Sequence, residues 1–221
     1  MPSIALLPEP LPENPLGLFG EWFQQARTLN VQPNPDAMVL ATVGEHNTPS
    51  ARVVLCKRLN LDEGYAVFFT NHHSRKGREL SQHARAAAVF HWDSLNRQVR
   101  IEGPVVASPA AESDAYFASR ALDSRLGAWA SKQSEPLDSR ATLVASVQEI
   151  AAKFGVAPGA TQAQVPRPPH WGGFRLWIET LELWTEGPHR VHDRALWNRT
   201  VQRHDEHTFK AGAWSATRLN P

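Results

Sequence analysis

The sequence has a single cysteine, Cys56, among its 221 residues. One cysteine cannot form an internal disulfide, which excludes a disulfide-stabilised secreted scaffold and favours a reducing compartment. No apolar run approaches the ~18 residues that a membrane span requires. Residues 1–15 also lack the basic start and the apolar stretch of a signal peptide. We therefore expect a cytoplasmic protein with no membrane partner.

The sequence also has little net charge. Its 23 Lys and Arg residues nearly balance 22 Asp and Glu residues, which gives a formal net charge of +1. A chain without strong positive charge has no general attraction to nucleic acid or to an anionic membrane, so neither is predicted as a partner. A mean hydropathy of −0.40 with 42% hydrophobic residues is typical of a globular protein with a sizeable core. The length favours one domain over residues 1–221.

Several catalytic signatures are missing as well. No glycine-rich nucleotide- or dinucleotide-binding loop and no G-x-S-x-G elbow is present. Two pairs of histidines, His72 with His73 and His189 with His192, could be considered as metal ligands. Neither pair has the nearby carboxylates or cysteines, at the required spacing, that a metal site needs, so no metal is predicted. Cys56 lies in an apolar stretch, where packing is a more common role than nucleophilic attack.

The sequence is rich in short β-type segments with helices between them. Residues 1–15 hold five prolines, which is typical of an extended arm, because proline fixes φ and has no N–H. Helices are predicted from Asn14-Pro15 with an apolar stripe at 19, 22, 23 and 26, after Ser74, from Ser108 to about 121, and over about 138–154. Strands are predicted at 38–43, 52–57, 65–70, 86–92, 98–106, 174–179, 181–184, 195–201 and 214–219. Short, closely spaced strands favour a mainly β (α+β) antiparallel barrel with peripheral helices over a doubly wound parallel sheet.

Two adjacent cations stand where a strand ends and a helix begins. Arg75 and Lys76 directly follow the cap residue Ser74. The free N–H groups and the dipole of a helix start attract an anion. Positive side chains beside the helix start are repelled by the positive end of the helix dipole, unless an anion binds between them. The segment therefore predicts an anion site, and a solvated pair of surface cations is the alternative.

A second pair of cations flanks an apolar strand. Arg52 and Lys57 are five residues apart, which places their side chains on opposite faces of a regular strand. They can share a ligand only if the strand is irregular or if its backbone runs along the ligand. Ordinary solvent-facing strand ends are the alternative.

Three hydrogen-bond donors recur at helical spacing. Tyr116, Arg120 and Ser124 lie at i, i+4 and i+8, on one helical face if the helix persists. A phenol, a guanidinium and a hydroxyl suit a phosphate monoester, to which arginine can bind in bidentate fashion. A polar outer face of the helix is the alternative.

A third group of cations alternates near the C-terminus. Arg190, His192 and Arg194 share one face if this segment is a strand. Such neighbours repel each other unless an anion or an electron-rich ring lies against them. Trp184, shortly before them, could stack on a planar ligand.

Six segments together resemble the pyridoxamine 5′-phosphate oxidase family. They follow one another in order between about Leu16 and Pro221: RVVLCK at 52–57, FT at 69–70 with SRK at 74–76, RQV at 97–99, GAWASKQS at 127–134, PHWGGF at 169–174 and RVHDR at 190–194. The resemblance implies an antiparallel split β-barrel of the FMN-binding type. It also implies a homodimer with FMN at the subunit interface.

The resemblance carries a set of site residues with it. By position it implies FMN contacts at Arg52, Val53, Val54, Leu55, Lys57, Phe69, Thr70, Arg75, Lys76, Gln98, Gln133, Ser134, Trp184 and Arg194. It implies substrate contacts at Lys57, Tyr116, Arg120, Ser124, Arg190, Val191 and His192, with Arg190 and His192 in the catalytic role.

The implied activity is the oxidation of pyridoxamine or pyridoxine 5′-phosphate to pyridoxal 5′-phosphate, with O2 as acceptor and H2O2 as by-product. In this family FMN supplies the redox chemistry, and the protein orients the rings and stabilises negative charge. Two alternatives stay open. One is a related FMN oxidase of phenazine-type metabolism, because residues 1–15 contain no Arg and no Tyr, whereas family members usually have a basic and aromatic arm. The other is a flavin-binding split-barrel protein without oxidase turnover.

Overall fold

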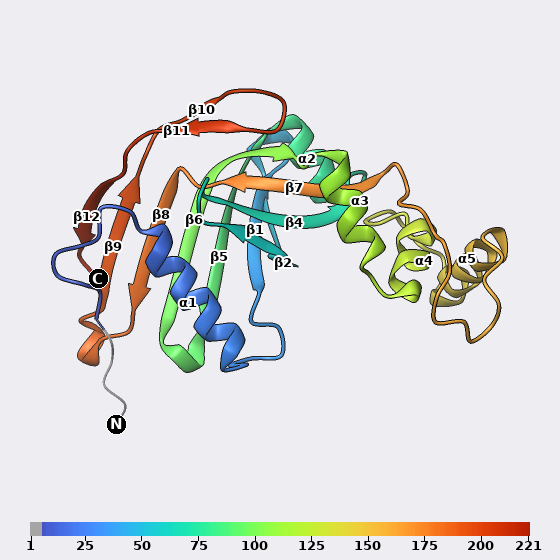
Figure 1. The fold of residues 1–221 in the computed structure, drawn as a ribbon, viewed down its shortest axis with the longest axis horizontal. Helices are drawn as coiled ribbons and strands as arrows, with labels where there is room; N and C mark the ends of the chain where they lie inside the picture. The colour runs from blue at the N-terminus through green and yellow to red at the C-terminus, as the bar shows by residue number, and fades with distance from the viewer. Residues whose placement is uncertain (1–5) are drawn as a thin grey trace.

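Antiparallel strands form the centre of the molecule, for which a computed structural model describes residues 6–221 (Figure 1). The strands are β1 (Ala37–Val43), β2 (Pro49–Leu55), β3 (Arg58–Asn60), β4 (Tyr65–Asn71), β5 (Arg85–Trp92), β6 (Arg97–Ala107), β7 (Trp171–Trp177), β8 (Thr180–Thr185), β9 (Asp193–Asn198), β10 (Val201–Arg203), β11 (Phe209–Ala211) and β12 (Ser215–Leu219). The helices are α1 (Leu16–Thr28), α2 (Arg75–Gln82), α3 (Ala110–Ala118), α4 (Leu122–Ala130) and α5 (Arg140–Lys153). Short 3₁₀ turns are η1 (Glu45–Asn47), η2 (Asp93–Leu95) and η3 (Pro188–Arg190).

The strands curl into a barrel because β6 pairs on both sides and changes partner along its length. The main order is β12-β9-β8-β6-β5-β1-β2, while the end of β6 pairs with β7, and β7 pairs with β4. Just after β2, the backbone N–H of Lys57 donates to the carbonyl of Val67 on β4, which brings the two ends of the curl together. The predicted antiparallel barrel with peripheral helices is confirmed.

The change of partner along β6 depends on a glycine. Glu102 pairs with Thr180 of β8, whereas Val105 already pairs with Leu176 of β7. Gly103 lies between these positions, and a Cβ there would collide with the carbonyl oxygen of Trp177. The backbones of β6 and the β7 end can approach this closely only because residue 103 has no side chain.

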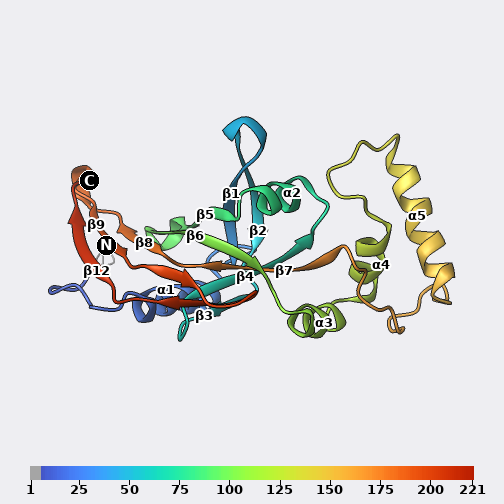
Figure 2. The same cartoon turned by 90° about the horizontal axis from the view of Figure 1, so that it is seen from above.

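The apolar patterns of the sequence build the core as expected. On β1, Met38, Leu40 and Thr42 point inward and are buried, while Val39 faces outward and is 43% exposed. The predicted stripe of α1 is buried against the sheet, where Phe23 meets Phe90 edge to face. A second cluster, built from α4, α5 and residues of the 154–165 segment, lies at the opposite end of the molecule from β9 and β12 (Figures 1 and 2).

The structure differs from the sequence prediction in two places outside the site. The helix expected from Ser108 to about 121 is α3, which ends at Ala118, and a separate helix that was not predicted, α4, follows because the backbone at Ala121 is extended (φ −53°, ψ 144°). This break allows α3 to pack on β7 while α4 packs on α5. The strands β3, β10 and β11 were not predicted, since each has only three residues.

Within residues 6–221, no helix combines the length and the apolar character needed to cross a membrane.

Candidate functional site

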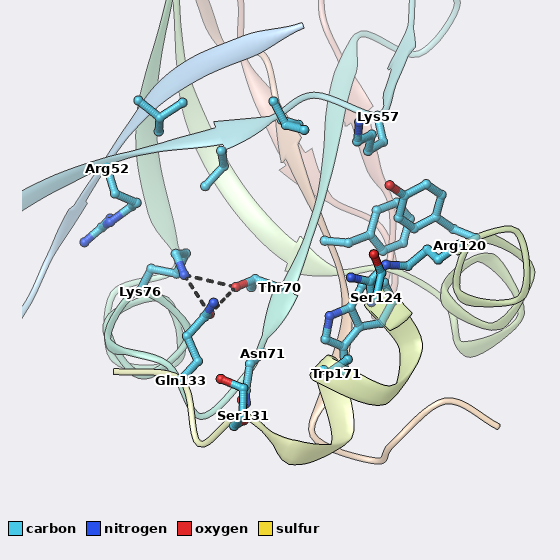
Figure 3. Close-up of a pocket in the computed structure, with 17 residues that line it drawn as sticks. Arg52, Lys57, Thr70, Asn71, Lys76, Arg120, Ser124, Ser131, Gln133 and Trp171 are labelled. Atoms are coloured by element: carbon cyan, nitrogen blue, oxygen red, sulfur yellow. Dashed lines mark hydrogen bonds between the residues drawn. The ribbon is translucent and has the colours of Figure 1, made fainter. Parts of the chain in front are cut away.

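A cavity of about 550 Å³ opens between β2, β4, α2 and the α3–α4 segment (Figure 3). Its wall is formed by Arg52, Val53, Val54, Leu55, Lys57, Phe69, Thr70, Asn71, Lys76, Tyr116, Arg120, Ser124, Gly127, Ala128, Ser131, Gln133 and Trp171. Twelve of these are residues that the sequence predicted as contacts for a cofactor or a substrate. They come from five segments of the chain that the barrel brings together.

The start of α2 forms one end of the cavity. Ser74 caps the helix as predicted, since its side chain accepts a hydrogen bond from the Gly77 N–H at 3.3 Å. The helix lies tightly against the preceding turn, because a Cβ at Gly77 would collide with the backbone of His72. The Lys76 ammonium donates to the Thr70 hydroxyl at 3.1 Å and to Gln133 Oε1 at 3.0 Å, as Figure 3 shows. The helix start, a buried cation and two polar side chains therefore meet at one point.

Two arginines near this end share one carboxylate. Arg52 Nη2 lies 3.1 Å from Glu79 Oε2, and Arg75 Nε lies 2.8 Å from Glu79 Oε1. The hydroxyls of Thr42 and Ser50 also donate to Glu79. Arg75 does not line the cavity itself, but Glu79 ties it to Arg52, which does.

Burial and neighbouring charges shift two pKa values in this cluster. Burial lowers the pKa of the Lys76 ammonium to about 8, the charge of Arg52 adds to this effect, and Glu79 opposes it. Burial by itself raises the pKa of the Glu79 carboxyl, but its hydrogen-bond donors outweigh burial and lower that pKa to about 2. At neutral pH the cluster therefore holds a charged carboxylate and a lysine that is still mostly protonated.

The α3–α4 segment forms the other end of the cavity. Tyr116 lies on α3, Arg120 in the break between the helices and Ser124 on α4. The helix does not persist through all three positions, so the helical spacing does not explain their proximity. The break nevertheless leaves all three side chains on the wall of the same cavity (Figure 3).

Aromatic rings support the guanidinium at this end. The ring centre of Phe69 lies 4.1 Å from that of Tyr116 and 5.5 Å from that of Trp171, and both pairs are stacked. The Arg120 guanidinium lies 4.8 Å from the Trp171 ring centre. Its Nη1 is buried and has no hydrogen-bond partner in residues 6–221. Burial lowers the pKa of Arg120. A buried N–H without an acceptor is costly, and an anionic ligand would supply the acceptor.

Arg52 and Lys57 both reach the cavity, although the spacing predicts opposite faces. The regular strand β2 ends at Leu55, and the chain then turns to pair with β4 through Lys57. This turn ends the alternation after Leu55, so the strand is irregular at this point, which is the condition under which Arg52 and Lys57 can share a ligand. Lys57 Nζ lies 3.4 Å from Asp36 Oδ2. Cys56 is buried, burial raises the pKa of its thiol to about 12, and the side chain is therefore not a nucleophile at neutral pH.

A second group of predicted residues lies outside this cavity. Gln98, Trp184 and Arg194 stand side by side in register on β6, β8 and β9. The Trp184 ring centre is 4.8 Å from that of His192, and the Arg194 guanidinium is held by Glu182 at 2.9 Å. Within one chain most of the predicted residues thus form two groups: the cavity residues, and the group of Gln98, Trp184, His192 and Arg194, called the β8–β9 cluster below.

The prediction that Arg190, His192 and Arg194 share one strand face is wrong. Arg190 belongs to the 3₁₀ turn η3, with φ of 66°, and β9 begins only at Asp193. The Gly187 N–H donates to His192 Nδ1 at 3.2 Å and closes this turn. Arg190 is exposed, and Val191 is 68% exposed. Ser134 is also exposed, with φ of 73°.

The N-terminal arm is tied to the strand that follows η3. The Leu7 N–H donates to Asp193 Oδ2 at 2.8 Å, and Arg218 binds both Asp193 and Glu9. The described part of the arm, residues 6–15, runs along β9 and β12 (Figure 1). The arm was predicted over residues 1–15, of which 1–5 lie outside the described residues.

Sequence reasoning missed several residues at the site. Glu79 lies one helical turn after Arg75, and this i,i+4 charge pair is a signal that could have identified it. Trp171, Asn71 and Ser131 line the cavity, but their proximity to it depends on the fold alone.

Two family models match the chain. One, described as pyridoxamine 5′-phosphate oxidase, covers residues 25–154. The chain belongs to the pyridoxamine 5′-phosphate oxidase family. The other, described as the pyridoxine 5′-phosphate oxidase C-terminal dimerisation region, covers residues 171–221 and supports a homodimer. The resemblance stated from the six segments is therefore confirmed.

Relatives of the chain carry the family's name. Proteins of Burkholderia lata and Paraburkholderia phymatum, both named pyridoxine/pyridoxamine 5′-phosphate oxidase, are each 49% identical to it over 208 residues, which is 94% of this chain and 89% of theirs. Membership of this family and the names of these relatives support an oxidase-type enzyme.

Solved structures share the fold. PhzG from Burkholderia lata 383, in complex with tetrahydrophenazine-1-carboxylic acid, superposes with a TM-score of 0.82 at 30% identity and covers 98% of both chains. A pyridoxamine 5′-phosphate oxidase-related, FMN binding protein from Nostoc punctiforme gives a TM-score of 0.65 at 16% identity, covering 93% of this chain and 96% of that one. The fold is therefore the split barrel of this FMN-binding family.

Proposed function

We propose that the protein is an FMN-dependent oxidase that converts pyridoxamine or pyridoxine 5′-phosphate to pyridoxal 5′-phosphate, with O2 as acceptor and H2O2 as by-product. The observation that carries the proposal is a cavity with an anion-binding group at each end. Arg52 and Lys76 lie at the α2 end, and Lys57 and Arg120 lie at the other. Two such ends suit a phosphorylated cofactor and a phosphorylated substrate in one cavity.

The residues at the α2 end fit FMN. A phosphate is a suitable ligand for a helix start with Lys76 and Arg52 beside it. The apolar strand residues Val53, Val54 and Leu55 form a wall against which a flat ring system can lie. The polar groups of Thr70 and Gln133 line the same cavity. The cofactor contacts proposed within this chain are the lining residues Arg52, Val53, Val54, Leu55, Lys57, Phe69, Thr70, Lys76 and Gln133. We propose Arg75 and Ser134 as further contacts, although neither lines the cavity in this chain.

The other end fits the phosphate of the substrate. Tyr116 and Ser124 offer hydroxyl donors beside the Arg120 guanidinium, whose buried Nη1 lacks an acceptor. Lys57 adds a positive charge at the same end of the cavity. A phosphate monoester would accept hydrogen bonds from all four side chains.

The β8–β9 cluster completes the site from a second subunit in this proposal. Gln98, Trp184 and Arg194 do not line the cavity of their own chain. The match to the family's dimerisation region includes β8, β9 and the η3 turn, which supports a position of Trp184 and Arg194 at a subunit interface, and Gln98 lies beside Trp184 on β6. Arg190, Val191 and His192 would then meet the substrate bound by the partner chain.

Each side chain has a role in positioning or charge stabilisation. Bound FMN would supply the redox chemistry by accepting a hydride from the substrate's C4′ carbon and passing the electrons to O2. The alcohol substrate then gives the aldehyde directly, whereas the imine left from the amine substrate is hydrolysed by water and releases ammonia. Arg120 and its neighbours fix the phosphate, which sets the position of the pyridine ring. The Gly187 N–H donates to His192 Nδ1, so a neutral His192 carries its proton on Nε2 and can donate it to the substrate. Arg190 contributes positive charge near the reacting carbon.

A phenazine-type oxidase is the second candidate, and the similarity to PhzG favours it. The phosphate-suited end around Arg120 argues against it, because a tricyclic carboxylate has no phosphate to place there. The identity to the relatives named pyridoxine/pyridoxamine 5′-phosphate oxidase is 49%, whereas the identity to PhzG is 30%. Both findings support the first candidate.

The test compares substrates on the FMN-loaded protein in air. We expect pyridoxamine 5′-phosphate to yield pyridoxal 5′-phosphate and an equal amount of H2O2, and unphosphorylated pyridoxamine to react only at a far higher KM. Turnover of a dihydrophenazine carboxylate without turnover of either phosphorylated vitamer would support the second candidate instead.

A further inference from the structure

One carboxylate lies within the cation cluster at the α2 end of the cavity, where a second anion is expected to bind. Glu79 is on α2, and its side chain is only 7% exposed. A negative charge next to a phosphate site weakens phosphate binding by repulsion. The functions assigned to the cavity so far do not require this residue.

The Glu79 carboxylate connects three elements of the fold. Its Oε2 accepts hydrogen bonds from Thr42 of β1, from Ser50 of β2 at 2.7 Å and from Arg52 of β2 at 3.1 Å. Its Oε1 accepts from Arg75 of its own helix at 2.8 Å. Thr42 and Ser50 face each other in register on neighbouring strands. Glu79 therefore holds two arginines from different elements in fixed positions.

We propose that Glu79 is a built-in counter-anion that keeps this cation cluster assembled before a phosphate arrives and thereby moderates how tightly the cavity holds FMN. The inference rests on the proposed function, because it takes the cluster as the site of the FMN phosphate. Arg52, Arg75 and Lys76 carry three positive charges, and Glu79 reduces the sum to +2. This charge equals in size that of a phosphate monoester dianion.

The electrostatics determine the direction of the effect. In the ligand-free protein, Glu79 offsets the repulsion among Arg52, Arg75 and Lys76. A bound phosphate offsets the same repulsion and is itself repelled by Glu79. The carboxylate therefore stabilises the free protein more than the complex, and removal of its charge must tighten the binding of a phosphate ligand.

The experiment measures flavin affinity by fluorescence titration of the apo-protein, together with its Tm. For Glu79→Gln we expect a lower Tm without ligand and a Kd for FMN about tenfold lower than that of the wild type, a factor that corresponds to 1.4 kcal/mol. Riboflavin has the same ring system without the phosphate, so its Kd should stay within about twofold of the wild-type value. A role that is only structural would shift both flavins together or neither.

Glu112 supplies a matched control. It also bridges two arginines, Arg58 and Arg175, at 3.4 and 3.0 Å, but neither of these arginines lines the cavity, whereas Arg52 beside Glu79 does. Glu112→Gln should lower the Tm and leave the ratio of the FMN and riboflavin affinities unchanged.

If the single variant Glu79→Gln does not fold, the same charge can be removed in a protein that already carries Arg75→Gln. The double variant Arg75→Gln/Glu79→Gln has the wild-type cluster charge of +2, whereas Arg75→Gln alone leaves +1. The double variant should bind FMN more tightly than Arg75→Gln alone, again without a change for riboflavin.

The outcomes separate this inference from the proposed function. Unchanged or weaker FMN binding on removal of Glu79, in either background, would overturn the inference while the proposed function stands. A wild-type protein that binds riboflavin as tightly as FMN would contradict the phosphate site itself, and with it both proposals.

Discussion

The guanidinium of Arg120 lies 4.8 Å from the ring centre of Trp171, and its buried Nη1 has no hydrogen-bond partner in residues 6–221. The Trp171 ring is itself held by stacking on Phe69, which also stacks on Tyr116. The arrangement fixes a buried positive charge on the cavity wall, and one N–H group of this guanidinium is free to donate a hydrogen bond to a ligand. We interpret this pair of residues as the base of the substrate's phosphate site.

Replacement of Arg120 tests that interpretation. Arg120→Ala should raise the KM for pyridoxamine 5′-phosphate by about 10- to 150-fold, since a hydrogen bond to a charged group is worth about 1.5–3 kcal/mol. The kcat should change much less, because the phosphate is remote from the reacting carbon. Steady-state kinetics measure both constants. Arg125→Ala is the control: Arg125 lies on α4, donates to the Ala163 carbonyl and is outside the cavity, so its KM should match the wild type. An unchanged KM in Arg120→Ala would refute the phosphate assignment.

FMN affinity should depend on pH through Lys76. Its pKa is lowered to about 8 by burial and by the charge of Arg52, whereas a bound phosphate favours the protonated form. Below pH 8 the lysine is charged in the free protein, and affinity should be nearly constant down to about pH 6, where the phosphate loses its second charge. Above pH 8 binding must include uptake of a proton, so affinity should fall by up to about tenfold per pH unit.

Two comparisons isolate Lys76 in this titration. Riboflavin has no phosphate, so its affinity should not fall above pH 8. In Lys76→Arg the charge persists at all these pH values, and the decline for FMN should disappear. A decline that is the same in wild type and Lys76→Arg would show that another group titrates.

Mixed dimers test whether the β8–β9 cluster serves the partner's cavity. Arg52→Ala damages the cavity side and Arg194→Ala damages the cluster side, so each homodimer should have little activity at limiting FMN. Co-refolded chains form heterodimers as half of the population, and each heterodimer has one site with both arginines intact. We expect recovery of about a quarter of the wild-type activity. If both groups acted within one chain, mixing would restore nothing.

The point at which β6 changes its pairing partner should tolerate no side chain at residue 103. A Cβ on Gly103 would collide with the backbone carbonyl of Trp177, which cannot move without breaking the pairing of β7. Gly103→Ala should therefore lower the free energy of unfolding by several kcal/mol or prevent folding. Gly17→Ala on α1 is the control, since open space surrounds that position, and it should be neutral or stabilising by about 0.5–1 kcal/mol. Urea denaturation measures both, and equal stabilities would contradict this account of the change of partner along β6.

Local sequence signals predicted much of the fold. The stripe of α1, the Ser74 cap and the strand at 38–43 were predicted from neighbouring residues, and the structure shows all three. Interruptions between helices and very short strands depend instead on contacts between residues that are distant in the sequence. The interruption at Ala121 has no glycine or proline to signal it, and β3 is too short to show a pattern.

The site was predictable where one segment supplies several residues. Val53, Val54 and Leu55 follow one another on β2, and all three line the cavity. Glu79 on α2 was missed because Thr42, Ser50 and Arg52, which donate hydrogen bonds to it, lie on β1 and β2. These strands are distant from α2 in the sequence, and only the folded barrel brings them next to Glu79. The face of Arg190 was mispredicted because the 3₁₀ turn η3 replaces the regular strand that the alternation assumed.

The most direct test of the proposed function uses the FMN-loaded protein without oxygen. On addition of pyridoxamine 5′-phosphate, the absorbance of the oxidised flavin should disappear promptly, and pyridoxal 5′-phosphate should form in an amount equal to the flavin. Flavin that stays bound and oxidised in the presence of pyridoxamine and pyridoxine 5′-phosphates would contradict the proposed function.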